Sequence, residues 1–387
     1  MGQEKKSEYP APPQYELIET AAALDAFARA AVGAGSLAVD VEADSMFHYQ
    51  ERVCLIQMAA NGHTVVIDPL RVTDLERLKP LFADPGIRKV FHGADYDVRS
   101  LYRDFGITID NLFDTQLASM YLGHAETSLE AVVAHRFGVE LDKKYQKKDW
   151  SRRPLPPEMV AYAACDVIYL IPLADALTRE LGEKGRLAWV QESCRLLSQV
   201  RPQENYPPLF LKFRGAGRLA PRQLAALEAL LQLRDQQARQ KDRPWFKIMG
   251  NATLLKIATE MPASLKRLKA GKALSPRQLE MYGQAIMAAL DEARQLPDDA
   301  LPVYPHRKSP RLSARIPRRI KALREWRDQV ADALILDPAL LFNKALLQEI
   351  AVHKPRTIEE LARIPQMHQW QVETFGEEIV EVLDRVP

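Results

Sequence analysis

The second half of the chain repeats itself. An offset of 93 residues takes Arg234-Asp235-Gln236 to Arg327-Asp328-Gln329 without a gap. Five further matches occur at the same offset: Ile257-Ala258 with Ile350-Ala351, Pro262 with Pro355, Leu268 with Leu361, Tyr282-Gly283 with Phe375-Gly376, and Leu290 with Leu383. The first copy opens with leucines at helical core spacing. The sequence therefore predicts two copies of one small all-α domain.

The repeat also sets the domain boundaries that we expect. The two helical domains should span residues 219–296 and 315–387, after a first domain at 14–200. Residues 201–218 are broken by prolines and glycines and are an expected linker, and residues 297–314 are a second one. A basic stretch without acids begins in the second linker; its cations are Arg307, Lys308, Arg311, Arg315, Arg318, Arg319 and Lys321.

The first domain mixes strand and helix signals. Two apolar runs, 53–59 and 64–68, flank the turn dipeptide Asn61-Gly62 and should pair as an antiparallel hairpin. From about residue 92 to 198 the pattern is helical. Further strands are expected at 15–18, within 36–45 and at 89–92, and helices at 20–32 and 74–82. This mixture predicts an α/β domain with a mixed sheet flanked by helices.

Composition limits the setting of the protein. The chain has 387 residues and a formal net charge of +2, so a nucleic-acid-binding signal must be local. Its three widely spaced cysteines, Cys54, Cys165 and Cys194, fit neither a disulfide framework nor a zinc cluster. Residues 1–13 form a polar, Pro-rich tail, and we expect neither a signal peptide nor a stretch of membrane-spanning length. These features favour a soluble cytoplasmic protein.

A short strand in the first domain ends in two acids. The run Ser36–Ser45 is apolar until Asp40 and Glu42, which share one face because side chains alternate along a strand. Two carboxylates on one face of a buried strand are costly unless a cation compensates them. The sharper interpretation is a divalent-metal site with oxygen ligands, suited to Mg²⁺ or Mn²⁺. The alternative is a strand end whose acids face solvent.

Two later segments supply further acids. After the expected strand at 89–92, Asp95 is a candidate helix cap and Asp97 would lie in the first helical turn. Further on, Tyr162 and Asp166 are four residues apart and share one face of a helix. The neighbours of Asp166 are apolar, so this carboxylate would be partly buried and need a partner. An exposed helix acid is the alternative for Asp166.

Taken in order, these motifs resemble the DEDD exonucleases of the tyrosine-bearing subgroup, and within it the ribonuclease D family. The motifs are Asp40-Val41-Glu42, His92 with Asp97, and Tyr162 with Asp166. Cys54-Leu55-Ile56-Gln57, Phe113-Asp114-Thr115-Gln116-Leu117 and Asp149-Trp150-Ser151-Arg152-Arg153-Pro154-Leu155 also look like that family. The duplicated domain resembles the HRDC module of certain helicases. The resemblance covers residues 14–385.

The resemblance implies an RNase H-like exonuclease domain followed by two HRDC-like domains. Its four acids would hold two divalent ions, with Asp40 shared between them. Glu42 and Asp166 would hold the ion that carries the attacking water, and Asp97 would support the other. Tyr162 would orient the water. Asp95 is the rival of Asp97, although the spacing from His92 favours Asp97.

The implied activity is 3′→5′ removal of nucleoside 5′-monophosphates from RNA with a free 3′ end, with tRNA precursors and other stable RNAs as substrates. Two alternatives stay open: a 3′→5′ DNA exonuclease acting in repair, and an inert nucleic-acid-binding protein that works through its HRDC-like repeats. The sequence does not indicate the oligomeric state.

Substrate contacts are predicted less sharply. Met46 would wedge against the terminal base or simply pack in its loop. His92 would contact substrate or make a structural hydrogen bond, and Asp114 is an expected helix cap or structural acid. Trp150 and Arg152 lie in a basic run that would follow phosphates or form a solvated loop. The other cations of that run are Lys143, Lys144, Lys147, Lys148 and Arg153. Further nonspecific contacts are expected from Lys266, Arg267, Lys269 and Lys272 of the first HRDC-like repeat.

Overall fold

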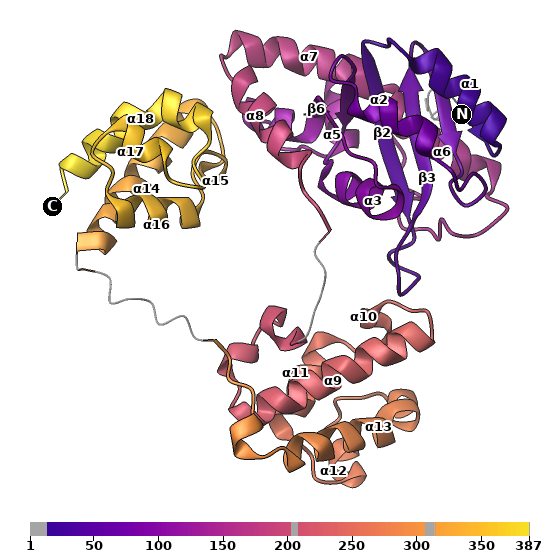
Figure 1. The fold of residues 1–387 in the computed structure, drawn as a ribbon, viewed down its shortest axis with the longest axis vertical. Helices are drawn as coiled ribbons and strands as arrows, with labels where there is room; N and C mark the ends of the chain where they lie inside the picture. The colour runs from indigo at the N-terminus through magenta and orange to yellow at the C-terminus, as the bar shows by residue number, and fades with distance from the viewer. Residues whose placement is uncertain (1–13, 203–207, 306–312, 314, 387) are drawn as a thin grey trace, which may run out of the picture. The chain divides into compact units, whose positions relative to one another are not determined.

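The computed structural model describes residues 14–202, 208–305, 313 and 315–386 (Figure 1). The expected N-terminal tail lies outside these residues, as do the linker cations Arg307, Lys308 and Arg311. The chain divides into two compact units. The first contains the chain up to Ala43, Val53–Pro202 and Pro310–Pro387, and the second contains Asp44–Arg52 and Gln203–Ser309.

A six-stranded mixed sheet forms the centre of the α/β domain in the first unit. Its strand order is β1-β4-β3-β2-β5-β6. The acidic strand β2 is central; it pairs antiparallel with β3 and parallel with β5. The strands are β1 Glu16–Ile18, β2 Ser36–Ala43, β3 Val53–Ala60, β4 His63–Ile67, β5 Arg88–Phe91 and β6 Leu112–Asp114. The predicted mixed sheet and its β3–β4 hairpin are confirmed.

One strand was not predicted. β6, Leu112–Asp114, lies in the stretch that was expected to be helical, and it pairs parallel with β5 at the edge of the sheet. Three residues are too few to show a period of two. The strand forms because Leu112 and Phe113 are buried and their backbone completes the pairing of β5.

Helices cover the sheet (Figure 1). They are α1 Ala21–Ala31, η1 Glu76–Leu78, α2 Lys79–Ala83, α3 Asp95–Phe105, α4 Thr115–Leu122, α5 Leu129–Phe137, α6 Pro157–Ile168, α7 Leu170–Glu183 and α8 Leu187–Leu197. The helix expected at 74–82 is only η1 followed by the single turn of α2. Helix α6 packs Val160, Ala163 and Ala164 against the buried side chains Leu55 and Val66 of the hairpin.

One apolar segment contradicts the expectation that no stretch reaches membrane-spanning length. Pro157–Glu183 has 27 residues and a peak mean hydropathy of 1.6. It comprises α6 and α7, and Leu173, Ala174 and Leu177 belong to the domain core. The segment is apolar because both helices bury one face within the α/β domain.

The second helical domain packs on the α/β domain within the same unit. Its helices are α14 Arg315–Leu334, α15 Pro338–Leu341, α16 Lys344–His353, α17 Ile358–Ala362 and α18 Gln369–Asp384. Trp370 of α18 stacks on Trp189 of α8, with ring centroids 4.6 Å apart. The Glu192 carboxylate accepts hydrogen bonds from the backbone N–H groups of Gln369 and Trp370, at 2.8 and 3.0 Å. This carboxylate satisfies donors at the N-terminus of α18 that have no partner within the helix.

The first helical domain lies in the second unit and shows the predicted repeat. Its helices are α9 Pro221–Gln240, α10 Trp245–Ile248, α11 Asn251–Glu260, α12 Leu265–Ala270 and α13 Pro276–Gln295. The 93-residue offset carries α10 onto α15 and α11 onto α16 residue for residue. Four cations of the basic stretch, Arg315, Arg318, Arg319 and Lys321, lie in α14 and so within the second helical domain.

The first predicted linker is partly folded. Leu209–Lys212 and Ala216–Arg218 form the short 3₁₀ helices η2 and η3. Phe210, Phe213 and Ala216 are buried in the core of the first helical domain. Residues 209–218 therefore belong to that domain; their prolines and glycines had suggested an unfolded connection.

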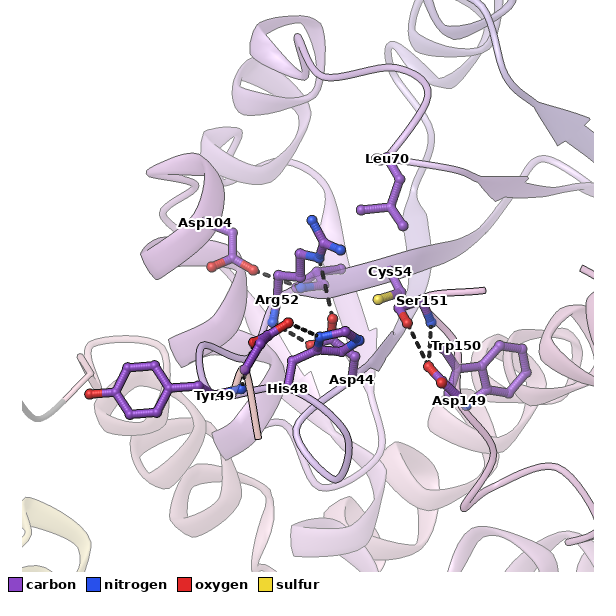
Figure 2. Close-up of polar contacts among 12 residues, drawn as sticks. Asp44, His48, Tyr49, Arg52, Cys54, Leu70, Asp104, Asp149, Trp150 and Ser151 are labelled. Atoms are coloured by element: carbon purple, nitrogen blue, oxygen red, sulfur yellow. Dashed lines mark hydrogen bonds and ion pairs between the residues drawn. The ribbon is translucent and has the colours of Figure 1, made fainter. Parts of the chain in front are cut away.

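The loop between β2 and β3 packs with the first helical domain. Within the loop, the buried Asp44 carboxylate accepts hydrogen bonds from the backbone N–H and the Nε of Arg52, at 2.8 and 3.2 Å (Figure 2). The Tyr49 hydroxyl donates to Asp235 at 2.7 Å, and His48 Nδ1 lies 2.7 Å from the Asp242 carboxylate. Asp44–Arg52 is thus an insertion that is structurally part of the second unit.

Candidate active site

Three acids predicted from separate motifs meet at the end of β2. Asp40 and Glu42 extend from β2, and Asp166 comes from α6. One ligand atom from each of the three lies within 4.8 Å of the others. The two sequence features, alternation along a strand and a buried helix face, therefore bring their carboxylates to one point. This geometry can hold a divalent cation.

The electrostatics of the group agree with that chemistry. Burial raises the pKa of Asp40 from 3.8 to about 7, against a lowering contribution from the Val41 backbone N–H. The pKa of Glu42 is raised well above its usual value by burial and then by the charges of Asp40, Asp166 and Asp97. The pKa of Asp166 is raised in the same direction by burial and by Asp40. Carboxylates that are this costly to ionise together suit a hard, oxygen-liganded cation such as Mg²⁺ or Mn²⁺.

Asp97 borders the group from the first turn of α3. Its side chain is buried, and its pKa is raised well above the usual value by burial and then by the charge of Asp40. Asp95, the rival of Asp97, is in a different environment: its carboxylate is half-exposed and pairs with Arg99 Nε at 2.7 Å. Asp95 is also not the helix cap that we expected; Ala94 occupies that position without a side-chain bond. Of the two candidates, Asp97 is the one that is buried and influenced by the charge of Asp40, although it is not among the three acids whose ligand atoms lie within 4.8 Å of one another.

Tyr162 faces the same group. Burial and the charges of Asp166, Glu42 and Asp40 all raise the pKa of its phenol. The Trp150 ring stacks on the Tyr162 ring at a centroid distance of 6.2 Å, and the Tyr145 ring contacts it edge-on at 5.7 Å. The two rings hold a neutral phenol beside the carboxylates, where it can donate a hydrogen bond.

A fifth acid, Asp114, organises the approach to Asp97. Its carboxylate accepts hydrogen bonds from Gly93 N at 2.9 Å and Ala94 N at 2.8 Å, in the turn between β5 and α3. It also accepts from Gln116 N and Leu117 N, so the predicted cap of α4 is confirmed. The hydrogen bonds that Asp114 accepts from the turn between β5 and α3 were not predicted, because the sequence did not show that β6 lies beside β5.

Gly93 makes this turn possible. Its φ of +76° lies in the left-handed region, and a Cβ there would be 2.9 Å from Gln116 Oε1. The Asp114 carboxylate and Gly93 together fix where α3 begins, and Asp97 lies in its first turn. Asp114 is therefore a positioning residue; its place at a helix start had indicated a cap or a structural acid.

The expected substrate contacts fall into different environments. Trp150 is only 1% exposed and packs under Tyr162, which corrects its prediction as a nucleic-acid contact: a buried ring serves as support. Arg152 is exposed and pairs with Asp149 at 3.1 Å; Asp149 also accepts from Ser151 Oγ at 2.6 Å (Figure 2). Met46 is 48% exposed and lies in the β2–β3 loop.

His92 makes the structural hydrogen bond that was the alternative to substrate contact. Its Nδ1 lies 2.9 Å from Thr115 Oγ1, and Thr115 in turn donates to the Phe91 carbonyl. Burial lowers the pKa of His92, which favours the neutral imidazole. Within the described residues its Nε2 is buried without a partner.

The basic run is only partly a solvated surface. The Arg153 guanidinium forms a two-pronged ion pair with the Asp68 carboxylate at 2.6 and 2.8 Å and donates to the Cys54 carbonyl. It fastens the loop before α6 to the hairpin, so it is structural. Lys143 pairs with Glu130. The exposed cations of the run are Lys143, Lys144, Lys147, Lys148 and Arg152, of which Lys143 and Arg152 are paired with acids.

Comparison with known proteins identifies the family of the chain. Residues 15–182 match the 3′-5′ exonuclease family model, and residues 223–290 and 317–383 each match the HRDC domain. The molecule is thus a 3′-5′ exonuclease-domain protein with two HRDC domains. Ribonuclease D of Escherichia coli K12 is 33% identical over 74% of this chain and 77% of its own length. Ribonuclease D of Cronobacter turicensis is 33% identical over 74% of this chain and 78% of its own.

Solved structures point the same way. The crystal structure of E. coli RNase D matches with a TM-score of 0.73 and 27% identity, covering 97% of this chain and all of that one. The catalytic core of RRP6 from Trypanosoma brucei matches with a TM-score of 0.63 and 31% identity, covering 74% of this chain and 82% of that chain. The chain belongs to the ribonuclease D family.

The raised pKa of Asp40 predicts a pH-dependent stability in the metal-free protein. Below pH 3.8 the carboxyl is protonated whether the chain is folded or not, and its stabilising contribution is fully present. As pH rises toward 7, ionisation favours the unfolded chain, and that contribution is lost. In EDTA, the free energy of unfolding of Asp40→Asn should therefore exceed that of the wild type at pH 8 by on the order of a few kcal/mol. At pH 5 the difference should be much smaller. An equal difference at both pH values, from calorimetry, would contradict the assignment.

Removing the Asp114 carboxylate should displace Asp97. An amide offers one acceptor oxygen where the carboxylate serves four N–H groups, and charge-assisted bonds contribute about 1.5–3 kcal/mol each. Asp114→Asn should lose about 2–4 kcal/mol of stability in urea unfolding. It should also weaken Mn²⁺ binding, measured by calorimetry, which a loss of helix capping alone would not do. Asp110→Asn, an exposed acid close in sequence, should change neither.

Proposed function

We propose that the protein is a 3′→5′ exoribonuclease that releases nucleoside 5′-monophosphates. The observation that carries this proposal is the convergence of Asp40, Glu42 and Asp166 within 4.8 Å, with Asp97 electrostatically linked to them. The family supports RNA as the substrate: its curated members include ribonuclease D, and exosome complex component 10 of mouse is 33% identical over 69% of this chain.

The four acids would hold two divalent cations, Mg²⁺ or Mn²⁺, and Asp40 would be shared between them. Glu42 and Asp166 would complete one ion's ligands, and Asp97 would support the other. Such a pair lowers the pKa of the attacking water and stabilises the negative charge that develops on the attacking and leaving oxygens. The donor set fits this role, since carboxylate oxygens are what Mg²⁺ and Mn²⁺ prefer.

The protein's own contribution is to place and orient. Tyr162, neutral and fixed by Trp150 and Tyr145, would donate a hydrogen bond that aligns the attacking water. The β2 backbone fixes Asp40 and Glu42 on one face, so the acids need little rearrangement when cations bind. A rigid ligand set of this kind keeps the reacting groups in line for displacement.

We infer tRNA precursors and other stable RNAs with free 3′ ends as substrates, processed in the cytoplasm. The exposed cations near α6, namely Lys144, Lys147, Lys148 and Arg152, would follow the phosphate backbone. Met46 would meet the terminal base. The three cysteines are thiols, which agrees with a reducing compartment.

Two other functions differ in a measurable way. No described residue distinguishes a 2′-hydroxyl, so a DNA exonuclease could use the same metal site. An inert nucleic-acid-binding protein would have no need of four acids that destabilise the domain when ionised without a cation. The chain carries these four acids although they lower the stability of the domain, and this favours the enzyme over the inert protein.

The test uses one RNA labelled at its 5′ or 3′ end, with an identical DNA strand alongside. In Mg²⁺, the wild type should release labelled mononucleotide immediately from the 3′-labelled RNA, and EDTA should stop release. Asp40→Asn and Asp97→Asn should each lower the rate by about a hundredfold or more, since each loses several kcal/mol of charge stabilisation.

Asp95→Asn is the matched control, because Asp95 is two residues from Asp97 but pairs with Arg99. It should keep near-normal activity. Loss of activity in Asp95→Asn with retention in Asp97→Asn would reverse the assignment of the fourth acid. Release from DNA alone would support the repair function, and no release from either strand would support the inert protein.

A further inference from the structure

The first HRDC domain contains a cavity that the exonuclease reaction does not use. Its volume is 560 Å³, and it opens between the folded linker segment and helices α9 and α10. Trp245 and Phe246 supply aromatic surface, and the cationic lining residues are Lys212, Arg214 and Arg234. Among the described residues, no acidic side chain lines it. A cavity with aromatic walls and only cationic charge suits an anion that carries a flat ring.

Among the described residues, Arg234 is held in this cavity by a backbone carbonyl and an amide oxygen and by no carboxylate. Its side chain is nine-tenths buried; one terminal nitrogen, Nη1, donates to the Met249 carbonyl at 3.2 Å and to Asn251 Oδ1 at 2.7 Å. Within the described residues its Nε is buried with no partner. The adjacent acid, Asp235, instead accepts from Tyr49 OH at 2.7 Å and from Trp245 Nε1 at 3.0 Å.

The second HRDC domain provides an internal comparison. Arg327 corresponds to Arg234 and makes the equivalent bond, to the Phe342 carbonyl at 2.9 Å. There, however, the neighbouring Asp328 accepts from Arg327 Nε at 2.9 Å and Nη2 at 2.7 Å. The aromatic pair is also missing, since the offset places Pro338 and Ala339 where the first copy has Trp245 and Phe246.

The two copies therefore differ in the features that an anion site needs. In the first copy, Trp245 and Tyr49 engage the acid that would otherwise neutralise the arginine. A buried guanidinium nitrogen without a partner is costly, and a phosphate oxygen would satisfy it with a charge-assisted bond. Phe246 is 54% exposed, which leaves a ring face available for stacking.

We propose that this cavity binds one nucleotide of single-stranded RNA, with the base against Phe246 and the phosphate against Arg214 and Arg234. This inference rests on the proposed function only in its choice of RNA as the anion. Stacking on an aromatic ring tolerates any base, so the site would hold substrate without reading its sequence. Among its described residues, the second HRDC domain lacks this aromatic pair, and its equivalent arginine, Arg327, is paired with Asp328.

The test is binding of a fluorescently labelled 12-nucleotide single-stranded RNA to the full chain in EDTA, where hydrolysis does not interfere. Phe246→Ala should weaken binding about tenfold, within the range of one stacked base. Arg214→Ala should weaken it similarly and lower the slope of affinity against salt by about one, whereas Phe246→Ala should leave that slope unchanged. These two signatures separate the stacking contact from the phosphate contact.

Met281→Ala is the matched control: Met281 is a 45% exposed apolar residue on α13 of the same domain, outside the cavity. It should bind RNA like the wild type, and all three variants should have the wild-type melting temperature. Wild-type affinity in both cavity variants, or an equal loss in Met281→Ala, would overturn the proposal. Mononucleotide release at saturating RNA should persist in Phe246→Ala, so failure of the cavity and failure of the nuclease assignment are read separately.

Discussion

The mutual repulsion of buried carboxylates at the end of β2 is the constraint on which the rest of the structure depends. Asp40, Glu42, Asp97 and Asp166 come from three elements, and burial raises the pKa of each. Ionising them together costs folding energy unless a cation is present. At this place, several independent contacts hold the acids in position against their mutual repulsion.

Those contacts come from several elements of the domain. The apolar face of α6 packs on β3 and β4, which sets the position of Asp166. The ion pair between Arg153 and Asp68 fastens the preceding loop to the same hairpin. On the other side, Asp114 joins β6 to the turn before α3 and so sets the position of Asp97. The site is rigid because its supports are tied to one sheet.

Short-range geometry accounts for part of what the sequence predicted of this site. A strand places Asp40 and Glu42 on one face, and a helix does the same for Tyr162 and Asp166. The grouping of these acids with Asp97 was implied only by the resemblance to the DEDD exonucleases. The helical repeat was equally visible, because its offset is constant along the chain.

What escaped prediction depends on contacts between segments distant in sequence. The strand β6 exists because β5 offers a free edge, and Asp114 has its second role only once β6 is in place. The burial of Trp150 needs the ring of Tyr162, and the folding of residues 209–218 needs the core of the first HRDC domain. None of these partners lies within a local sequence window.

The two HRDC domains show how a duplicated fold can diverge in use. The second packs on the exonuclease domain, where Trp370 stacks on Trp189 and its backbone N–H donates to Glu192, while the first keeps a buried arginine beside exposed aromatic surface. The two domains share their helices, and they differ in the partners of their acidic and aromatic side chains. A structural role and a binding role can thus arise from the same helices.

Anomalous diffraction from crystals soaked in Mn²⁺ tests most directly whether the four acids form a metal site. We expect a strong peak within about 2.5 Å of oxygens from Asp40, Glu42 and Asp166, and a second peak beside Asp40 and Asp97. Crystals with Mn²⁺ bound elsewhere and no anomalous density among these carboxylates would contradict it.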